Sequence, residues 1–443
     1  MHLHRYRIGT NDLNDRIIKK ADISKGEMNA YLGMLLFCIL SSLYVEVRSL
    51  CGICICLIFV CVGARDLPFA VSAYLMLTFW DNRLFLPGGV PVVTLLKICL
   101  ILLIFVNVVH DNLRIRLVDI ALFVLWTIYS MWNIVSNTDF GGISMVFDLV
   151  IVVFVYSHCC KCENSYREVF WKKIFFALFL SSLNCTVLGY FELVAGLNLK
   201  YVYVSGQMFS RFRGVVGIDR YHFIACTGMI YPLYYSKNKI AKIVAVLFFT
   251  VSIIMTVSLS AVAGLIVFYI LYFNFKYKGR SKGKLFVLFF VAIIVFHRIW
   301  RNGSGISFVD NVLLRIKRTI DIVDAGDYGK ATSGRTEIWL EYMQVFKESK
   351  LLTKLFGTGY LNQYRIQNFS HYAHNSYIDI LLLSGMFGSA LIFCKCITSI
   401  FRKKKDVSES VYEQVFLMKA SAFVAGFTVS AMTADYWLIF FLI

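Results

Sequence analysis

Apolar residues in this chain come in long blocks, and the length of the blocks limits what it can fold into. They occupy approximately 29–45, 49–63, 67–80, 91–109, 117–135, 141–160, 171–198, 221–236, 240–257, 259–275, 284–300, 376–400, 414–432 and 434–443. A helix needs about 20 apolar residues to cross a bilayer core. Only 16% of the residues are charged, which excludes a conventional soluble enzyme. The sequence predicts an all-α polytopic membrane protein with about 12–14 transmembrane helices.

Basic residues gather in the short connections between these segments. The chain carries 45 Lys and Arg against 27 Asp and Glu, a net charge of +18. With a cytoplasmic N-terminus, the strongly basic short loops all fall inside the cell, as the positive-inside rule requires; they are 110–116, 161–173, 237–242, 276–284 and 401–413. Membrane orientation thus explains much of the charge. No nucleic-acid-binding motif is present, and we expect no nucleic-acid partner.

The alternation of spans and loops predicts the organisation of the chain. The expected parts are a cytoplasmic segment 1–28, transmembrane helices 29–198, an Arg-rich periplasmic loop 199–220, transmembrane helices 221–300, a large helical periplasmic loop 301–375 and C-terminal transmembrane helices 376–443. A loop of about 75 residues buries too little surface to fold stably as a separate domain. We therefore expect both outward loops to dock on the outer ends of the spans, and we look for function in their positive charge.

The first outward loop ends with three arginines beside a membrane segment. It reads Arg211-Phe212-Arg213-Gly214-Val215-Val216-Gly217-Ile218-Asp219-Arg220. Arginine suits bidentate contact with phosphate oxygens, and glycine lets backbone N–H groups approach an anion. The same arginines could instead extend from the membrane to the lipid headgroups. An anion site at Arg211, Arg213 and Arg220 and simple anchoring are both open on these residues alone.

The second outward loop contains a predicted amphipathic helix. Trp339, Met343 and Phe346 recur at helical spacing, and Ser333-Gly334 lies at the expected start. Arg335 would occupy the first turn, where the helix dipole disfavours a cation. An anion bound between the helix N-terminus and this guanidinium would explain the position. Further along, Gly357-Thr358-Gly359 is a turn and no nucleotide loop, because no Gly-Lys-Ser/Thr follows.

A third motif runs from His371 to Asp379 into an apolar segment. Asn375 or Ser376 can cap the helix, with Asp379 three residues after Ser376 as in a capping box. A helix N-terminus beside His374 favours the neutral imidazole, which can accept a proton. His371 and His374 lack a third metal ligand, and the cluster 158–162 of one His and three Cys lacks a second ligand group, so we predict no metal site.

In this order, the three motifs resemble the O-antigen ligase and polymerase superfamily, the Wzy and WaaL type of bacterial envelope protein. The resemblance covers about residues 200–395 by motifs and implies a GT-C-like membrane fold. By similarity, Arg211 and Arg335 match the arginines of the two loops and His374 matches the family's histidine. The chain departs from the family at 257–261, which reads Val-Ser-Leu-Ser-Ala where many members have Ser-Arg-Gly.

The resemblance implies glycosyl transfer in the bacterial inner membrane, at the periplasmic face, from a glycan carried on undecaprenyl diphosphate. Arg211, Arg335 and His374 would be catalytic; the substrate-binding residues would be Arg213, Arg220, Asn375, Trp339 and His371. The reaction would be inverting and need no cofactor. Other implied partners are membrane lipid and a chain-length regulator. We expect a polymerase, which adds the glycan to another lipid-linked repeat unit; a ligase would use lipid A–core.

A transporter or lipid flippase is a further alternative. Such a protein would carry ionisable residues deep within its spans and repeats between its halves. The nearest cases in the spans are Glu46, Asp148 and Glu192, and the two halves of the sequence show no repeat. The sequence therefore favours an enzyme over a transporter.

Overall fold

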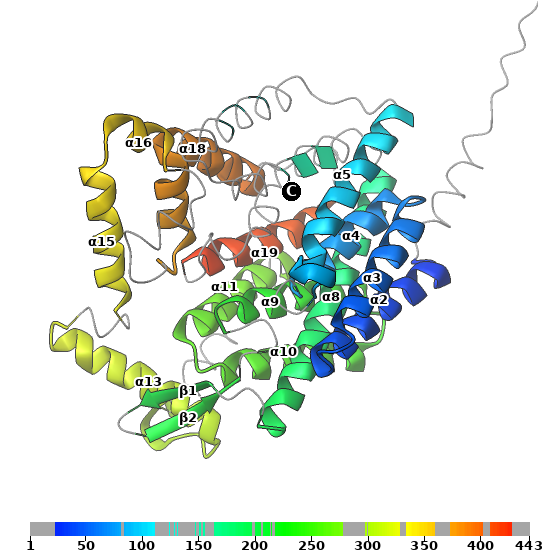
Figure 1. Ribbon diagram of the computed structural model, residues 1–443. Coiled ribbons are helices and arrows are strands. Elements are labelled where there is room, and N and C mark those ends of the chain that lie inside the picture. Colours follow the sequence, from blue (N-terminus) through cyan, green and yellow to red (C-terminus); the bar gives the residue numbers. More distant parts are fainter. Residues whose placement is uncertain are drawn as a thin grey trace, which may run out of the picture. The chain divides into compact units, whose positions relative to one another are not determined.

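The elements of the computed structural model are shown in Figure 1. The chain forms two compact units. The structure describes residues 23–80, 84–110, 164–196, 200–204, 207–212, 214, 218–277, 297–298, 300–327, 334–358, 373–401 and 408–427, with isolated positions between 124 and 155. Unit 1 comprises Met1–Arg116, Phe154–Ser181 and Lys403–Tyr412. Unit 2 comprises Leu117–Val153, Ser182–Arg402 and Glu413–Ile443. The long helix α8 (Asn164–Val194) contributes to both units.

Unit 1 is built from apolar helices, and side chains cap the first turns of two of them, α2 and α4. Besides the first part of α8, its elements are α2 (Lys25–Leu43), α3 (Arg48–Gly63), α4 (Leu67–Thr78), the 3₁₀ turn η2 (Pro87–Gly89) and α5 (Val92–His110). Ser24 and Glu27 form a reciprocal capping box at the start of α2. The Asp66 carboxylate accepts from the Phe69 N–H at the start of α4.

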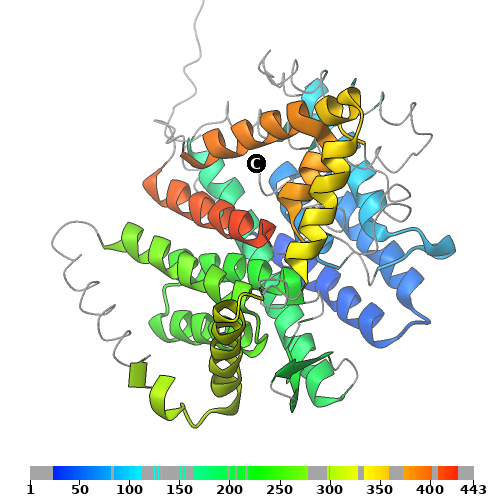
Figure 2. The same ribbon diagram turned by 90° about the vertical axis from the view of Figure 1, so that its left-hand side faces the viewer.

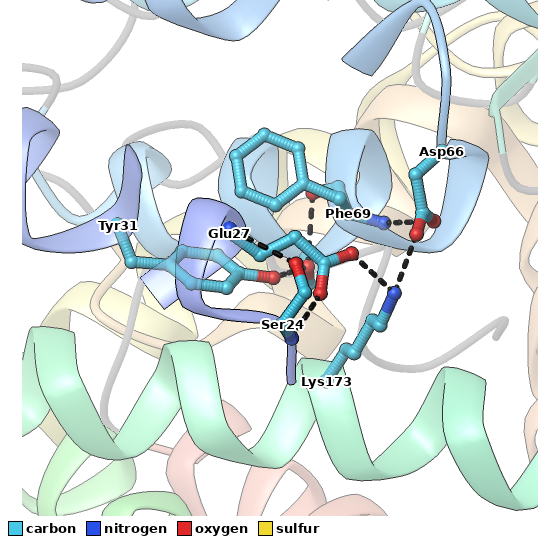
Figure 3. A network of polar contacts seen from close by, with 7 residues as sticks. Ser24, Glu27, Tyr31, Asp66, Phe69 and Lys173 are labelled. Atoms are coloured by element: carbon cyan, nitrogen blue, oxygen red, sulfur yellow. Dashed lines mark hydrogen bonds and ion pairs between the residues drawn. The ribbon is translucent and has the colours of Figure 1, made fainter. Parts of the chain in front are cut away.

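Lys173 joins three of these helices through two carboxylates, as Figure 3 shows. Its ammonium nitrogen lies 2.6 Å from a carboxylate oxygen of Glu27 and 2.5 Å from one of Asp66. The lysine is 4% exposed. Because a buried ammonium is costly unless it is paired, the two carboxylates fix the starts of α2 and α4 against α8.

Unit 2 contains the second part of α8, most of α19 (Glu409–Gly426) and the remaining elements. The remaining elements are β1 (Lys200–Val204), β2 (Gln207–Arg211), α9 (Ile218–Tyr235), α10 (Lys239–Met255), α11 (Leu259–Lys276), α13 (Ser307–Asp324), α15 (Arg335–Glu348), α16 (Leu351–Phe356) and α18 (Ser376–Phe401). Helix α9 packs between α10 and α11, and buried hydroxyls join it to α8: Thr186 bonds the Tyr221 hydroxyl at 2.8 Å. Helix α15 packs against α18 (Figure 1 and Figure 2).

The first outward loop contains structure that the sequence did not predict. Strands β1 and β2 form an antiparallel hairpin in which Lys200 pairs with Arg211, and α13 packs against β1. Helix α9 begins at Ile218, earlier than the predicted residue 221. The larger loop is helical as expected, with α13, α15 and α16.

The prediction of an all-α membrane protein is confirmed, with this small hairpin as an addition. Each predicted apolar segment in the described part of the chain is occupied by a helix. Of the described helices, those at Lys25–Leu43, Ser165–Val194 and Leu259–Lys276 are long and apolar enough to cross a bilayer. The predicted spans 117–135, 141–160, 284–300 and 434–443 lie outside the described residues, apart from isolated positions, and the predicted count of 12–14 spans stays a prediction.

Candidate functional site

Arg335 is the first residue of α15, as the sequence predicted. Gly334 precedes it with a φ of 78°, in the left-handed region that glycine adopts without steric strain, and contributes no capping side chain. The first turn of the helix thus has no side-chain cap from Gly334, and Arg335 itself is half-buried. N–H donors and a guanidinium at one helix terminus favour an anion.

Trp339, one turn further along α15, ties this helix to the third motif. Its indole N–H donates to the carbonyl oxygen of Ala373 at 2.8 Å. Ala373 is completely buried, and it packs in one apolar cluster with Tyr342 of α15 and Leu382 of α18. The predicted substrate-binding tryptophan thus has a structural bond, and that bond holds the residue that precedes His374.

His374 has an unusual backbone conformation between two fixed neighbours. Its φ is 49°, in the left-handed region, which costs about 1–2 kcal/mol for a residue other than glycine. On one side lies Ala373. On the other, the Asn375 side-chain oxygen accepts from the N–H groups of Tyr377 (3.0 Å) and Ile378 (3.3 Å). The structure therefore selects Asn375 as the cap, and Ser376 begins α18. Packing on both sides holds the half-buried imidazole at this turn.

Arg211 is the last residue of β2, and its neighbour anchors the first outward loop. The N–H of Phe212 donates to the carbonyl oxygen of Met255 at the end of α10, at 3.1 Å. The Phe212 ring is buried against Tyr190 and Tyr221, with centroids 4.6 and 5.0 Å away. The side chain of Arg211 lies outside the described part of the chain, as do the Arg220 side chain and residues Arg213 and His371.

Arg315 is a basic residue at this site that the sequence reasoning missed. It lies in α13, and its guanidinium donates to the carbonyl oxygen of Val257 in the turn between α10 and α11. Burial lowers the pKa of Arg315, and the positive charge of Arg335 lowers it further. The two guanidinium groups therefore lie within electrostatic range of each other. No motif marks Arg315, because it follows Leu313 and Leu314 on an ordinary amphipathic helix.

Hydrogen bonds and one electrostatic interaction thus connect the three motifs within unit 2. The end of β2 is bonded to the end of α10, α13 is bonded to the α10–α11 turn, and α15 is bonded to the residue before His374. The electrostatic effect of Arg335 on Arg315 connects α13 with α15. The structure brings Arg335, Trp339, His374 and Asn375 to one region, and it brings the backbone of Arg211 to the same series of contacts.

Comparison with known proteins identifies a family domain over part of this region. Residues 244–393 match the Wzy_C family model, described as O-antigen ligase. The match covers about a third of the chain, from α10 to α18, and it does not include the β1–β2 hairpin. No curated protein and no solved structure matches the chain.

Proposed function

We propose that this chain, which carries a Wzy_C domain of the O-antigen ligase and polymerase superfamily, is an O-antigen polymerase. It takes a glycan from undecaprenyl diphosphate at the periplasmic face of the inner membrane and transfers it to another lipid-linked repeat unit. The observation that carries the proposal is the bond from Trp339 to Ala373, because it joins the helix that starts with Arg335 to the turn that holds His374. A cation and a candidate base are thereby fixed in one region.

The leaving group determines what the arginines do. Negative charge develops on the diphosphate as the glycosidic bond breaks, and fixed guanidinium groups in a site of reduced dielectric stabilise that charge. Arg335 supplies one such group beside the first N–H groups of α15. Arg211 supplies another, with support from Arg213, while Arg220 and His371 line the bound glycan. In this proposal arginines provide the positive charge that the departing diphosphate needs.

His374 acts on the acceptor. Its imidazole takes the proton of the attacking hydroxyl, which then bonds to the anomeric carbon on the face opposite the departing diphosphate. A single displacement of this kind inverts the configuration at that carbon. Asn375 fixes the start of α18 and so holds the imidazole in position.

Replacement of His374 tests this role. Asparagine tolerates left-handed backbone better than most residues, so His374→Asn preserves the turn and removes the base. We expect the variant to keep the wild-type melting temperature in detergent within a few degrees and to lose at least about 100-fold in polymer formation. A variant that still makes long glycan chains at the wild-type rate would eliminate His374 as the base.

The acceptor is tested separately, because the matched family is described as O-antigen ligase and this description favours transfer to lipid A–core as a second candidate. Gels of lipopolysaccharide from a deletion strain distinguish the two. A single repeat unit on the core indicates a lost polymerase. Lipid-linked polymer that accumulates without any attached repeat indicates a lost ligase.

A further inference from the structure

The turn between α10 and α11 is where two basic elements of unit 2, the end of β2 and α13, come together. Directly before the turn, at the end of α10, the carbonyl of Met255 accepts the N–H of Phe212, the residue that follows Arg211. Within the turn, the carbonyl of Val257 accepts the guanidinium N–H of Arg315. Val257 is 2% exposed and has a φ of 50°. A buried β-branched residue seldom adopts this conformation, so surrounding contacts hold the turn in place.

The bond to Val257 leaves most of the Arg315 guanidinium for another partner. A guanidinium has five N–H donors in a planar fork, and the contact with Val257 uses one nitrogen. Both effects on the pKa of Arg315, burial and the charge of Arg335, oppose its charged form. Two neighbouring cations of this kind are stabilised when an anion with several oxygens lies between them.

We propose that Arg315 binds the same diphosphate as Arg335, and that Val257 holds the Arg315 fork in the orientation that faces the anion. This inference rests on the proposed function, since the ligand is the diphosphate of the glycan donor. It adds to that function a cation from α13, a helix outside the three motifs. The chemical class recognised is a diphosphate monoester of a polyprenol, and the charged group is the part that Arg315 contacts.

Binding of farnesyl diphosphate to the full chain in lipid nanodiscs tests the assignment. This soluble probe carries the diphosphate on a short prenyl chain, and titration calorimetry gives its Kd at several salt concentrations. Arg315→Gln should weaken binding at least about tenfold, the loss typical of a hydrogen bond to a charged group. The variant should also show a weaker dependence of Kd on salt, because one cation no longer contacts the anion.

Arg318 provides the matched control. It lies three residues further along α13 and is exposed. Arg318→Gln removes the same charge from the same helix, and we expect less than a twofold change in Kd. Arg315→Lys is the second variant: it keeps the charge and loses the fork, so its Kd should rise by at least about threefold even if Arg315→Gln fails to fold.

The outcomes separate this inference from the proposed function. If the wild-type chain binds farnesyl diphosphate no better than farnesol, the lipid-diphosphate donor and Arg315 fail together. If the wild type prefers the diphosphate and the Arg315 variants bind as tightly as the Arg318 variant, the donor stands and the role of Arg315 is refuted. A lower melting temperature with an unchanged Kd and salt dependence would equally refute it, because Arg315 would then only support Val257.

Discussion

His374 and Val257 are the two residues other than glycine with positive φ in the described part of the chain. Each is at or next to a contact between distant elements: Ala373, which precedes His374, accepts from Trp339, and Val257 itself accepts from Arg315. Left-handed backbone at such residues costs about 1–2 kcal/mol and persists only where packing enforces it. Both strained positions lie in the series of contacts that connects the candidate site.

At the residue scale, Arg335→Lys tests whether the first residue of α15 binds an anion through its fork. Lysine keeps the charge and loses the planar pair of donors, so we expect kcat/KM for glycan polymerisation to fall at least about tenfold. An assay of the polymerisation of lipid-linked repeat units by the purified protein measures kcat/KM. Arg318→Lys, at an exposed position of α13, is the control and should leave the rate unchanged. Equal activities of the two variants would mean that Arg335 only contacts the lipid headgroups.

Sequence patterns predicted part of this site and could not predict the rest. The start of α15 at Arg335 follows from Gly334 and the apolar spacing behind it, and Asn375 was one of two predicted caps. Arg315 had no local signal, since its role depends on a carbonyl 58 residues earlier in the chain. The left-handed backbone of His374 likewise depends on packing between two helices. Contacts distant in sequence leave no spacing pattern.

At the element scale, the turn at Gly357 after α16 fits an interruption of α18 at Gly385. Gly385 has a φ of 62° and interrupts α18. Next to this interruption, the carbonyl of Leu382 accepts from Thr358, through its N–H at 2.9 Å and its hydroxyl at 3.2 Å. The turn after α16 thereby supplies the hydrogen bonds that the broken helix lacks. The motif predicted as a turn at Gly357 thus shapes the helix that begins beside His374.

Gly385→Ala tests this fit. A methyl group there would lie 2.4 Å from the backbone nitrogen of Gly357 and 2.5 Å from the carbonyl oxygen of Leu355, besides the strain of positive φ. We expect a loss of at least about 3 kcal/mol in stability, seen as a lower melting temperature and a lower yield in membranes. Gly326→Ala has a φ of 77° with nothing within 4 Å and should cost only about 1–2 kcal/mol. Similar losses of stability in both variants would show that the strain of positive φ alone explains the effect at Gly385, without a clash with the turn after α16.

Helices were predicted well where the sequence contains a long apolar segment. The predicted segments at 49–63 and 259–275 differ from α3 and α11 by at most one residue at each end. The hairpin was missed because each of its strands has only five residues and lies between two membrane segments. Strand patterns of that length are weak beside apolar blocks three to four times longer.

At the scale of the whole molecule, polar contacts inside each unit agree with the predicted crossings. Glu27, Asp66 and Lys173 meet, and the predicted topology places two spans between the first pair and four between the second. In unit 2, the Tyr234 hydroxyl donates to Glu413 at 3.2 Å, again with four predicted spans between them. An even number of crossings returns the chain to the same side of the membrane, as these contacts require.

Lys173→Met tests the importance of the charged network in unit 1. The change leaves two carboxylates close together without their ammonium, and breaking a buried pair in this way costs about 3–5 kcal/mol. We expect a lower melting temperature in detergent and a higher sensitivity to protease in membranes. Lys239→Met at an exposed position of α10 is the control and should change stability by less than about 1 kcal/mol. A stable Lys173→Met protein would show that the apolar packing of unit 1 suffices.

The orientation of the chain tests the proposed function, which places the glycosyl transfer at the periplasmic face of the membrane. An even number of crossings between two residues shows that they lie on the same side of the membrane, but not whether that side is the cytoplasm. The basic short loops indicate which side is cytoplasmic. Alkaline phosphatase, active only after export, should therefore be active when fused after Gly326, between α13 and α15, and inactive when fused after Lys237, between α9 and α10. The reverse pattern would place Arg335 and His374 on the cytoplasmic side and contradict the proposed transfer at the periplasmic face.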